Sequence, residues 1–307
     1  MPESLHPQTS TAISLQEFID FIDDNPIISA LKNSEYKPEY FSIIGEKLAQ
    51  LVLNRDFLTD ILIEELKQFE TFQMANDFKP STIMIHKHAD YTIRAVIWMP
   101  LSELYPAEVF SYFEPHDHNF DFFTVGYFGP GYTTKLFQYD YDKVKGFPGE
   151  EVNIKHLGET NLTQGKVMYY YASEDAHIQY PPQSMTVSLN LLLPKTFPAH
   201  RRQYEFELIA NTDRAKLIMG NIDRLAQQRT LIETAARIGN AESMNIIRKI
   251  ALTHNNEQLR AIAWQALFAS GTTTAADRQL ALQDSSEHVH AFVMNFLDME
   301  QIKARAG

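Results

Sequence analysis

Apolar residues recur at helical spacing over the first part of the chain. Ser14 and Glu17 have the spacing of a capping box, in which each side chain satisfies a free backbone amide at the start of a helix. Two further stretches, 40–53 and 57–69, repeat apolar residues at steps of three and four with charged residues between them. We therefore expect an N-terminal helical segment over residues 1–80.

The pattern changes after residue 80 to short runs of Ile, Val, Thr, Tyr and Phe, which are separated by Gly, Pro, Asp and Asn. Such runs favour β-strands. Since no long helical pattern lies between them, they predict an antiparallel sandwich or barrel rather than a parallel sheet. The predicted strands are 81–85, 91–98, 121–128, 133–139, 152–157, 167–171 and 186–193.

The last third of the chain is helical again and contains an internal repeat. Residues 255–267 align with residues 285–297 at a constant offset of 30, and further helical stretches, 242–253 and 274–283, precede the two copies. A period in this range is typical of stacked helical hairpins, because each unit buries its apolar face only against its neighbour. The identical pairs are Glu257 and Glu287, Ala261 and Ala291, and Leu267 and Leu297.

These patterns divide the chain into three parts: an N-terminal helical segment over 1–80, a β-domain over 81–211 and a helical repeat domain over 212–307. The repeat domain has two interpretations. It either offers a docking surface to another protein chain, or it is a helical cap that covers the β-domain.

Composition and charge narrow the range of functions. The 307 residues include 27 Lys and Arg against 39 Asp and Glu, and the net charge of −12 repels a nucleic-acid backbone. No stretch has the run of roughly 18 to 20 apolar residues that a membrane helix needs, and the polar N-terminus has no apolar core of a signal peptide. We therefore expect a cytoplasmic protein that binds neither nucleic acid nor membranes.

The chain has no cysteine, which excludes disulfides, a cysteine nucleophile, zinc fingers and iron–sulfur clusters. Histidine and carboxylate side chains remain as metal ligands. His116 and His118 are two residues apart at the mouth of a predicted strand, so both imidazoles point to the same face. His177 follows 59 residues later, and a hairpin-rich barrel can bring it alongside them.

Three neutral imidazoles on one face form an open site for a divalent transition metal, with positions left for substrate and for dioxygen or water. The alternative interpretation is that these histidines are exposed or hydrogen-bonded within the core. Tyrosines 169–171 and Tyr180 lie in the same zone, where a phenol can donate a proton to a metal-bound substrate or fill the core.

The segment 91–194 resembles the cupins, and among them the cysteine dioxygenase (thiol dioxygenase) group. The C-terminal helices resemble HEAT-type repeats. The resemblance implies a mixed α+β fold, in which a central cupin-type antiparallel β-barrel is flanked by the N-terminal helical segment and the C-terminal helical domain. His116 and His118 match the family's His-x-His pair, and His177 matches its later His. Residues 186–192 match the closing strand, and Arg94 matches an upstream Arg.

By this resemblance, His116, His118 and His177 hold iron(II), or another divalent transition metal, in a dioxygenase. The substrate is then a small thiol, an amino-acid-like molecule or a peptide. Open positions on the metal let the substrate and dioxygen bind side by side, and the protein contributes orientation and electrostatics.

The resemblance also suggests roles for three other side chains. Arg94 would pair with a substrate carboxylate, and Tyr169 or Tyr171 would position the bound intermediate. The chain departs from the family in other places: the cupin glutamate is absent, Asp121 comes too early to replace it, and Asn190 stands where the closing strand has His. A missing acidic ligand fits the three-His thiol dioxygenases.

Two alternatives stay open. The chain is either a non-catalytic cupin that binds a metal or ligand and recruits a partner through its helices, or a 2-oxoglutarate-dependent oxygenase. His88 and Asp90 have the His-x-Asp spacing of those oxygenases, which use two His and one carboxylate. His86 and His88 also fit a polar strand face. In such an oxygenase the distal His would be His177 or His156. The basic residue that binds the cosubstrate would be Lys195, Arg201 or Arg202.

Overall fold

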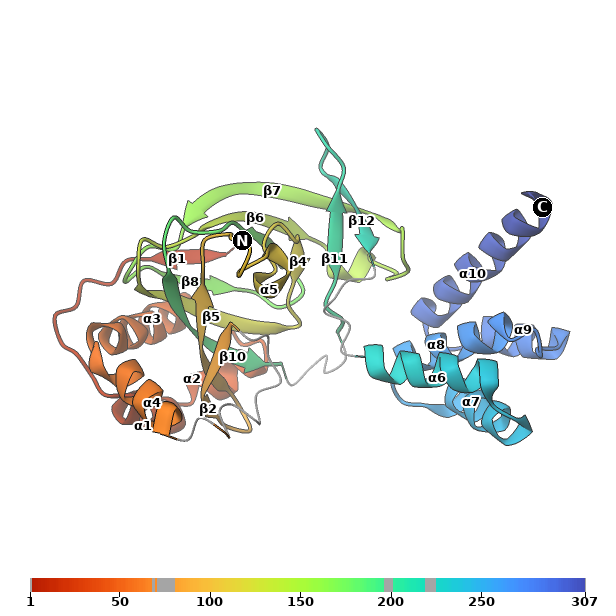
Figure 1. Cartoon of the computed structure of the whole chain (residues 1–307), viewed down its shortest axis with the longest axis horizontal. Coiled ribbons are helices and arrows are strands. Elements are labelled where there is room, and N and C mark those ends of the chain that lie inside the picture. The colour runs from red at the N-terminus through yellow and green to blue at the C-terminus, as the bar shows by residue number, and fades with distance from the viewer. Residues whose placement is uncertain (1, 68–69, 71–80, 196–200, 219–224, 307) are drawn as a thin grey trace. The chain divides into compact units, whose positions relative to one another are not determined.

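The computed structural model describes residues 2–67, 70, 81–195, 201–218 and 225–306 (Figure 1). The chain forms two compact units. The barrel unit comprises the residues up to 140 together with 153–203 and 211–213. The helical unit comprises 141–152, 204–210 and the residues from 214 onward.

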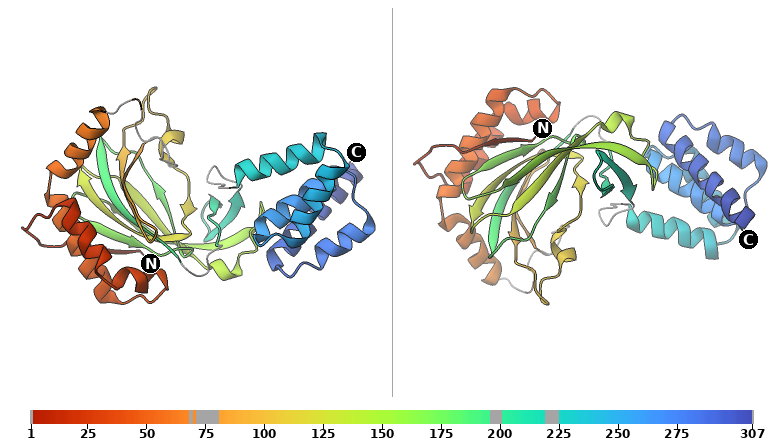
Figure 2. Two further views of the ribbon diagram at one scale, coloured as in Figure 1. Left: turned by 90° about the horizontal axis from the view of Figure 1, so that it is seen from below. Right: turned by 90° about the horizontal axis from the view of Figure 1, so that it is seen from above.

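Four helices form the N-terminal part of the barrel unit. The capping box is confirmed: Ser14 Oγ accepts a hydrogen bond from Glu17 N at 3.1 Å, and Ser14 N donates to Glu17 Oε2 at 2.7 Å. Helices α2 and α3 pack against the six-stranded sheet of this unit (Figure 2). The helices are α1 (Leu15–Asp23), α2 (Ile27–Lys32), α3 (Pro38–Leu53) and α4 (Asp56–Lys67), of which α2 was not predicted.

The six-stranded sheet has the order β1-β8-β5-β10-β3-β2, and its paired strands run antiparallel. The five longer strands confirm the sequence predictions for their regions to within a few residues, whereas β1 was not predicted. The strands are β1 (Glu3–Leu5), β2 (Thr82–Lys87), β3 (Thr92–Trp98), β5 (Phe120–Phe128), β8 (Val167–Tyr170) and β10 (Thr186–Pro194).

A second sheet, in which β7, β6, β9 and β4 follow one another, closes into a barrel. The predicted fold class, mixed α+β with an antiparallel barrel and helices at both ends of the sequence, is confirmed. The short helix α5 precedes β4. The bounds are α5 (Ala107–Phe110), β4 (His116–Asp117), β6 (Thr133–Tyr139), β7 (Glu151–Asn161) and β9 (Asp175–Gln179).

The two faces of the six-stranded sheet bury different sets of side chains, because successive residues of a strand point to opposite faces. On β5, Phe123 and Val125 belong to the core beneath the helices. Their neighbours Phe120 and Phe122 belong to a second core with Trp98, inside the barrel. We call these faces the helix face and the inner face.

In the helical unit, a β-hairpin precedes the helices. The sequence pattern indicated helices from about residue 212, but β12 occupies Arg214–Ile218 and the first described helix starts at Ala226. The internal repeat coincides with the starts of two helices, since Glu257 opens α8 and Glu287 opens α10. The elements are β11 (Glu205–Leu208), β12, α6 (Ala226–Ile238), α7 (Ala241–Thr253), α8 (Glu257–Ala269), α9 (Ala275–Leu282) and α10 (Glu287–Ala306).

The core of the helical unit surrounds Trp264, which is 1% exposed. An ion pair reinforces it: Arg260 Nε and Nη2 each lie 2.8 Å from the carboxylate of Asp284, just before α10. The two helices that carry the repeat are thereby tied together. Assignment to the HEAT class stays a prediction.

None of the described helices combines the length and apolar character that a membrane crossing requires.

Candidate metal centre

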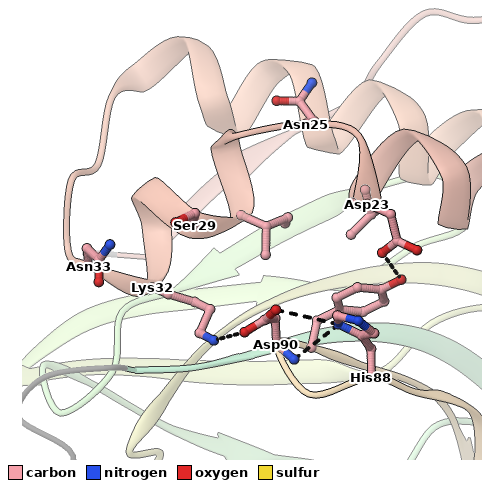
Figure 3. Close-up of a pocket in the computed structure, with 10 residues that line it drawn as sticks. Asp23, Asn25, Ser29, Lys32, Asn33, His88 and Asp90 are labelled. Atoms are coloured by element: carbon pink, nitrogen blue, oxygen red, sulfur yellow. Dashed lines mark hydrogen bonds and ion pairs between the residues drawn. The ribbon is translucent and has the colours of Figure 1, made fainter.

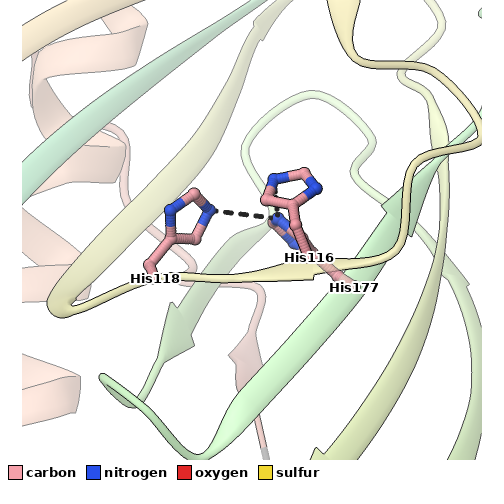
Figure 4. A group of neighbouring side chains, drawn as sticks. All are labelled: His116, His118 and His177. Atoms are coloured by element: carbon pink, nitrogen blue, oxygen red, sulfur yellow. Dashed lines mark hydrogen bonds between the residues drawn. The ribbon is translucent and has the colours of Figure 1, made fainter. Parts of the chain in front are cut away.

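Short strand pairing brings the three predicted histidines together. His116 on β4 lies directly opposite His177 on β9, and His118 follows two residues after His116. Their side chains converge inside the barrel unit, with one ligand atom from each lying within 4.8 Å of the others (Figure 4). In the part of the chain that the structure describes, this is the one group of three or more potential metal ligands found.

The ring nitrogens of the three histidines face one another. His177 Nε2 lies 3.2 Å from His118 Nε2 and 3.2 Å from His116 Nε2. His116 Nδ1 lies 2.8 Å from the carbonyl oxygen of Glu114, which only accepts, so this nitrogen carries the proton and Nε2 of the neutral ring keeps its lone pair. A proton on His177 Nε2 can be directed at only one of these two neighbouring nitrogens. A bound cation, in contrast, can accept the lone pairs of all three Nε2 atoms.

Burial, reinforced by neighbouring His116, holds the pKa of His177 well below its ordinary value. The ring therefore stays neutral at physiological pH, which is the form that binds a metal. His116 and His177 are 5% and 3% exposed, and His118 is half-buried. The donor set of three imidazoles with a half-open side fits a divalent transition metal.

Aromatic side chains from the inner face enclose the histidines. The ring of Phe122 lies edge-on to His118 at 4.9 Å between centroids and stacks on Tyr170 at 4.6 Å. The ring of Tyr170 in turn lies 4.8 Å from that of His177. Burial raises the pKa of Tyr170 well above its ordinary value, so its phenol stays protonated beside the site.

Two glutamines that were not predicted as site residues contact the histidines. Gln179 Nε2 lies 2.8 Å from His177 Nε2, and Gln203 Nε2 lies 2.9 Å from His118 Nδ1. Gln179 carried a usable signal, because it is two residues after His177 on the same strand and so shares its face. Gln203 carried none, since it lies between β10 and β11 and belongs to no strand.

The structure places Tyr169 and Tyr171, the two tyrosines expected to position the bound intermediate, away from the histidines. Tyr169 belongs to the core beneath the helices, and its hydroxyl donates to Asp121. Tyr171 donates to Glu3 and packs edge-on against Tyr169. Tyr170, between them in sequence, faces the histidines, because alternate residues of β8 point to opposite faces.

Arg94 lies on the inner face, as a substrate-binding arginine would require. Val96 and Trp98 follow it on β3 at steps of two residues, so they share its face, and both belong to the inner core. In register, Arg94 lies beside Asn190. Asn190 Oδ1 accepts a hydrogen bond from Thr124 Oγ1 at 2.8 Å. Thr124 is two residues beyond Phe122, so the Arg94 row is offset by about 7 Å along the strands from the row that borders His118.

Asp121, which lies too early in the sequence to replace the cupin glutamate, helps to hold the fold together instead. It points to the helix face, where its carboxylate forms an ion pair with Lys195 and accepts a hydrogen bond from Ala172 N at 2.7 Å. Lys195 is thus engaged with Asp121.

The alternative pair, His88 and Asp90, lies in the turn between β2 and β3. This turn and α2 border a pocket of about 410 Å³ (Figure 3). Asp90 forms an ion pair with Lys32, and His88 Nδ1 lies 3.8 Å from Asp90 Oδ2. Among the described residues, neither side chain belongs to a group of three potential metal ligands, and His156 instead contacts the ring of Phe137.

Comparison with known proteins gives partial similarities. No family model and no curated protein matches the chain. Among solved structures, hydroquinone 1,2-dioxygenase from Sphingomonas sp. TTNP3 with 4-hydroxybenzoate bound is 12% identical, with a TM-score of 0.27 over 41% of this chain and 73% of that one. A cupin domain from Bordetella pertussis Tohama I is 13% identical, with a TM-score of 0.23 over 38% of this chain and 96% of that one.

The DMSP lyase DddQ from Ruegeria pomeroyi DSS-3 is 11% identical, with a TM-score of 0.21 over 42% of this chain and 53% of that one.

Proposed function

We propose that this chain is a cupin-type, iron(II)-dependent dioxygenase with a three-histidine metal centre. The observation that carries the proposal is the convergence of His116, His118 and His177, whose ligand atoms lie within 4.8 Å of one another inside the barrel unit. Bound iron(II) would supply the one-electron chemistry that dioxygen requires. Other divalent metals also suit imidazole ligands, so iron is the part of the proposal that needs direct measurement.

The protein's own residues would orient the substrate. Arg94 offers a planar guanidinium on the inner face, which suits bidentate binding of a carboxylate. The inner-face neighbour Tyr132 is buried, and burial raises its pKa to about 12, an effect that the charge of Arg94 partly opposes. This neutral phenol and the Thr124–Asn190 pair give the face further hydrogen-bonding groups. We propose a small thiol or amino-acid-like substrate with an anionic end, or a peptide.

Tyr170 would be the phenol next to the reacting groups. Its ring contacts that of His177, and its raised pKa keeps the hydroxyl as a proton donor. A Tyr170→Phe variant should therefore lower turnover and leave metal content unchanged. Tyr169→Phe is the matched control, because its phenol lies on the helix face and should not affect turnover.

Oxygen uptake by the iron-loaded protein tests the proposed activity. A panel of small thiols, amino acids and short peptides is added, and uptake is compared with that of His177→Ala. His156→Ala is the matched control, since His156 lies on β7 beside Phe137. The proposal predicts stimulated uptake by at least one panel member in the wild type and in His156→Ala. Equal uptake by the wild type and His177→Ala for every member would refute the thiol-oxygenase form.

A second function, recruitment of a protein partner, is favoured by the surface of the helical unit. Leu231, Ile238 and Ile246 on α6 and α7 are 69%, 81% and 55% exposed. Helices α6 and α7 pack against each other, and a contiguous apolar patch exposed on a protein surface marks an interaction site. Replacing the three by Ser should impair turnover of a peptide substrate and spare that of a small thiol. Equal effects on both substrates would count against recruitment.

A further inference from the structure

We propose that Gln179 is a fourth metal ligand, which binds through its side-chain oxygen and completes a neutral set of three imidazoles and one carboxamide. The inference rests on the proposed metal centre and deepens it. Gln179 ends β9, and the period of two along a strand places it on the same face as His177. Its side chain is 5% exposed, so it is well removed from solvent.

The hydrogen bonding of Gln179 is unbalanced without a cation. Its Nε2 lies 2.8 Å from His177 Nε2 and 3.3 Å from His177 Nδ1. Its Oε1 is buried and has no hydrogen-bond partner among the described residues. Leaving a buried amide oxygen unsatisfied is unfavourable, which makes such atoms rare in native proteins.

Binding of a metal by the three histidines would change which atom of this amide is favoured. With its lone pair engaged, His177 Nε2 could no longer accept a hydrogen bond from Gln179. The amide nitrogen would instead point its hydrogens at a cation, which is repulsive. Turning the amide by half a rotation exchanges nitrogen and oxygen in nearly the same space, so Oε1 rather than Nε2 would face the bound ion.

A carboxamide oxygen is a weaker donor than a carboxylate and adds no charge. Because the four donors would all be neutral, the bound ion would keep its full positive charge. An anionic substrate would therefore be attracted both by the ion and by Arg94 on the inner face. This favours the anionic member of the proposed substrate class over a neutral one.

Cobalt(II) is the probe for the test, because its visible absorption reports coordination number independently of activity. The full-length protein is titrated with cobalt(II) as wild type, Gln179→Leu and Gln179→Glu, with circular dichroism to verify the fold. Gln138→Leu is the matched control, since Gln138 is a half-buried glutamine on the neighbouring strand β6, where its register partner is Asp175.

We expect Gln179→Leu to weaken cobalt(II) binding by about 10- to 100-fold, the usual effect of removing a residue that supports a metal site, and to change the visible spectrum. Gln179→Glu should bind at least as tightly as the wild type and keep its coordination number, which also covers the case in which the Leu variant fails to fold. Gln138→Leu should match the wild type.

Two results overturn the inference in different ways. If Gln179→Leu has the wild-type affinity and spectrum while His177→Ala loses cobalt(II), Gln179 is not a ligand and the three-histidine centre stands. If the wild type itself binds no cobalt(II), the metal centre and the proposed function fail together.

Discussion

Phe122 is expected to support the metal centre as well as the fold, and a pair of substitutions on one strand separates the two roles. The ring of Phe122 contacts His118 edge-on and stacks on Tyr170, which contacts His177. Two of the three proposed ligands are therefore held by one aromatic cluster. Its neighbour Phe123 points to the helix face and is equally buried, at 0% exposed against 4%.

The expected loss of stability is similar at the two positions. Replacing a buried Phe by Ala removes its burial and leaves a cavity, at about 3–5 kcal/mol, and each lost ring contact adds about 0.5–1.5 kcal/mol. Such a loss is a large part of the stability of an ordinary domain. Phe122→Leu and Phe123→Leu are therefore the working variants, because they keep most of the side-chain volume and are expected to lose about 1 kcal/mol.

Metal affinity is where the two variants should differ. Loosening the rings of His118 and His177 should weaken cobalt(II) binding by about tenfold in Phe122→Leu, at the low end for residues that support ligands. Phe123→Leu should leave the affinity unchanged. Denaturant unfolding measures the stability of each variant, and competitive titration measures its affinity. Equal affinities in the two variants, at equal loss of stability, would refute the role of the aromatic cluster.

Two further predictions concern the fold. Gly126→Ala should destabilise the protein by about 1–3 kcal/mol in a thermal unfolding assay, because the added Cβ would lie 2.2 Å from the carbonyl oxygen of Thr163. Gly45→Ala in helix α3 is the control. The nearest atoms there belong to a flexible side chain at 3.2 Å, so this change should be neutral or stabilising in the same assay. The Arg248 guanidinium holds the pKa of the Asp277 carboxyl below its ordinary value. The pair therefore stabilises the fold above about pH 4 and loses this effect as the pH falls. Between pH 6 and pH 2, the free energy of unfolding should thus fall more steeply in the wild type than in Asp277→Asn. Parallel curves for the two proteins would contradict this.

The sequence predicted the longer elements because their patterns extend over several turns or residues. The capping box at Ser14 marks a helix start by local chemistry alone, and the predicted stretch 186–193 contains the buried centre of β10. The strands that assemble the histidines have no such length. β4 covers His116–Asp117, and its pairing with β9 is set by the tertiary fold rather than by any local periodicity.

The sequence identified the three histidines but not which tyrosine faces them, and the reason is physical. The histidines could be found because their residue type restricts the chemistry and their spacing places His116 and His118 on one face. The tyrosine run could not be assigned a face, since Tyr169, Tyr170 and Tyr171 are chemically identical and only the strand register decides which one points inward. A shift of one residue reverses every side chain of a strand.

Arg94 was placed by resemblance alone, and its position on the inner face follows from the alternation of β3. Whether it binds a substrate carboxylate stays a prediction. An Arg94→Lys variant keeps the charge and loses the planar fork, so we expect a raised KM for an anionic substrate with little change in kcat.

The most direct test of the central claim is the metal content of the purified protein, measured by elemental analysis. The proteins compared are the wild type, the control His156→Ala, and the three variants His116→Ala, His118→Ala and His177→Ala. We expect iron close to a single ion per chain in the wild type and the control, and its loss in each of the three variants. Wild-type protein that holds no metal after reconstitution, or variants that retain it, would refute the three-histidine metal centre.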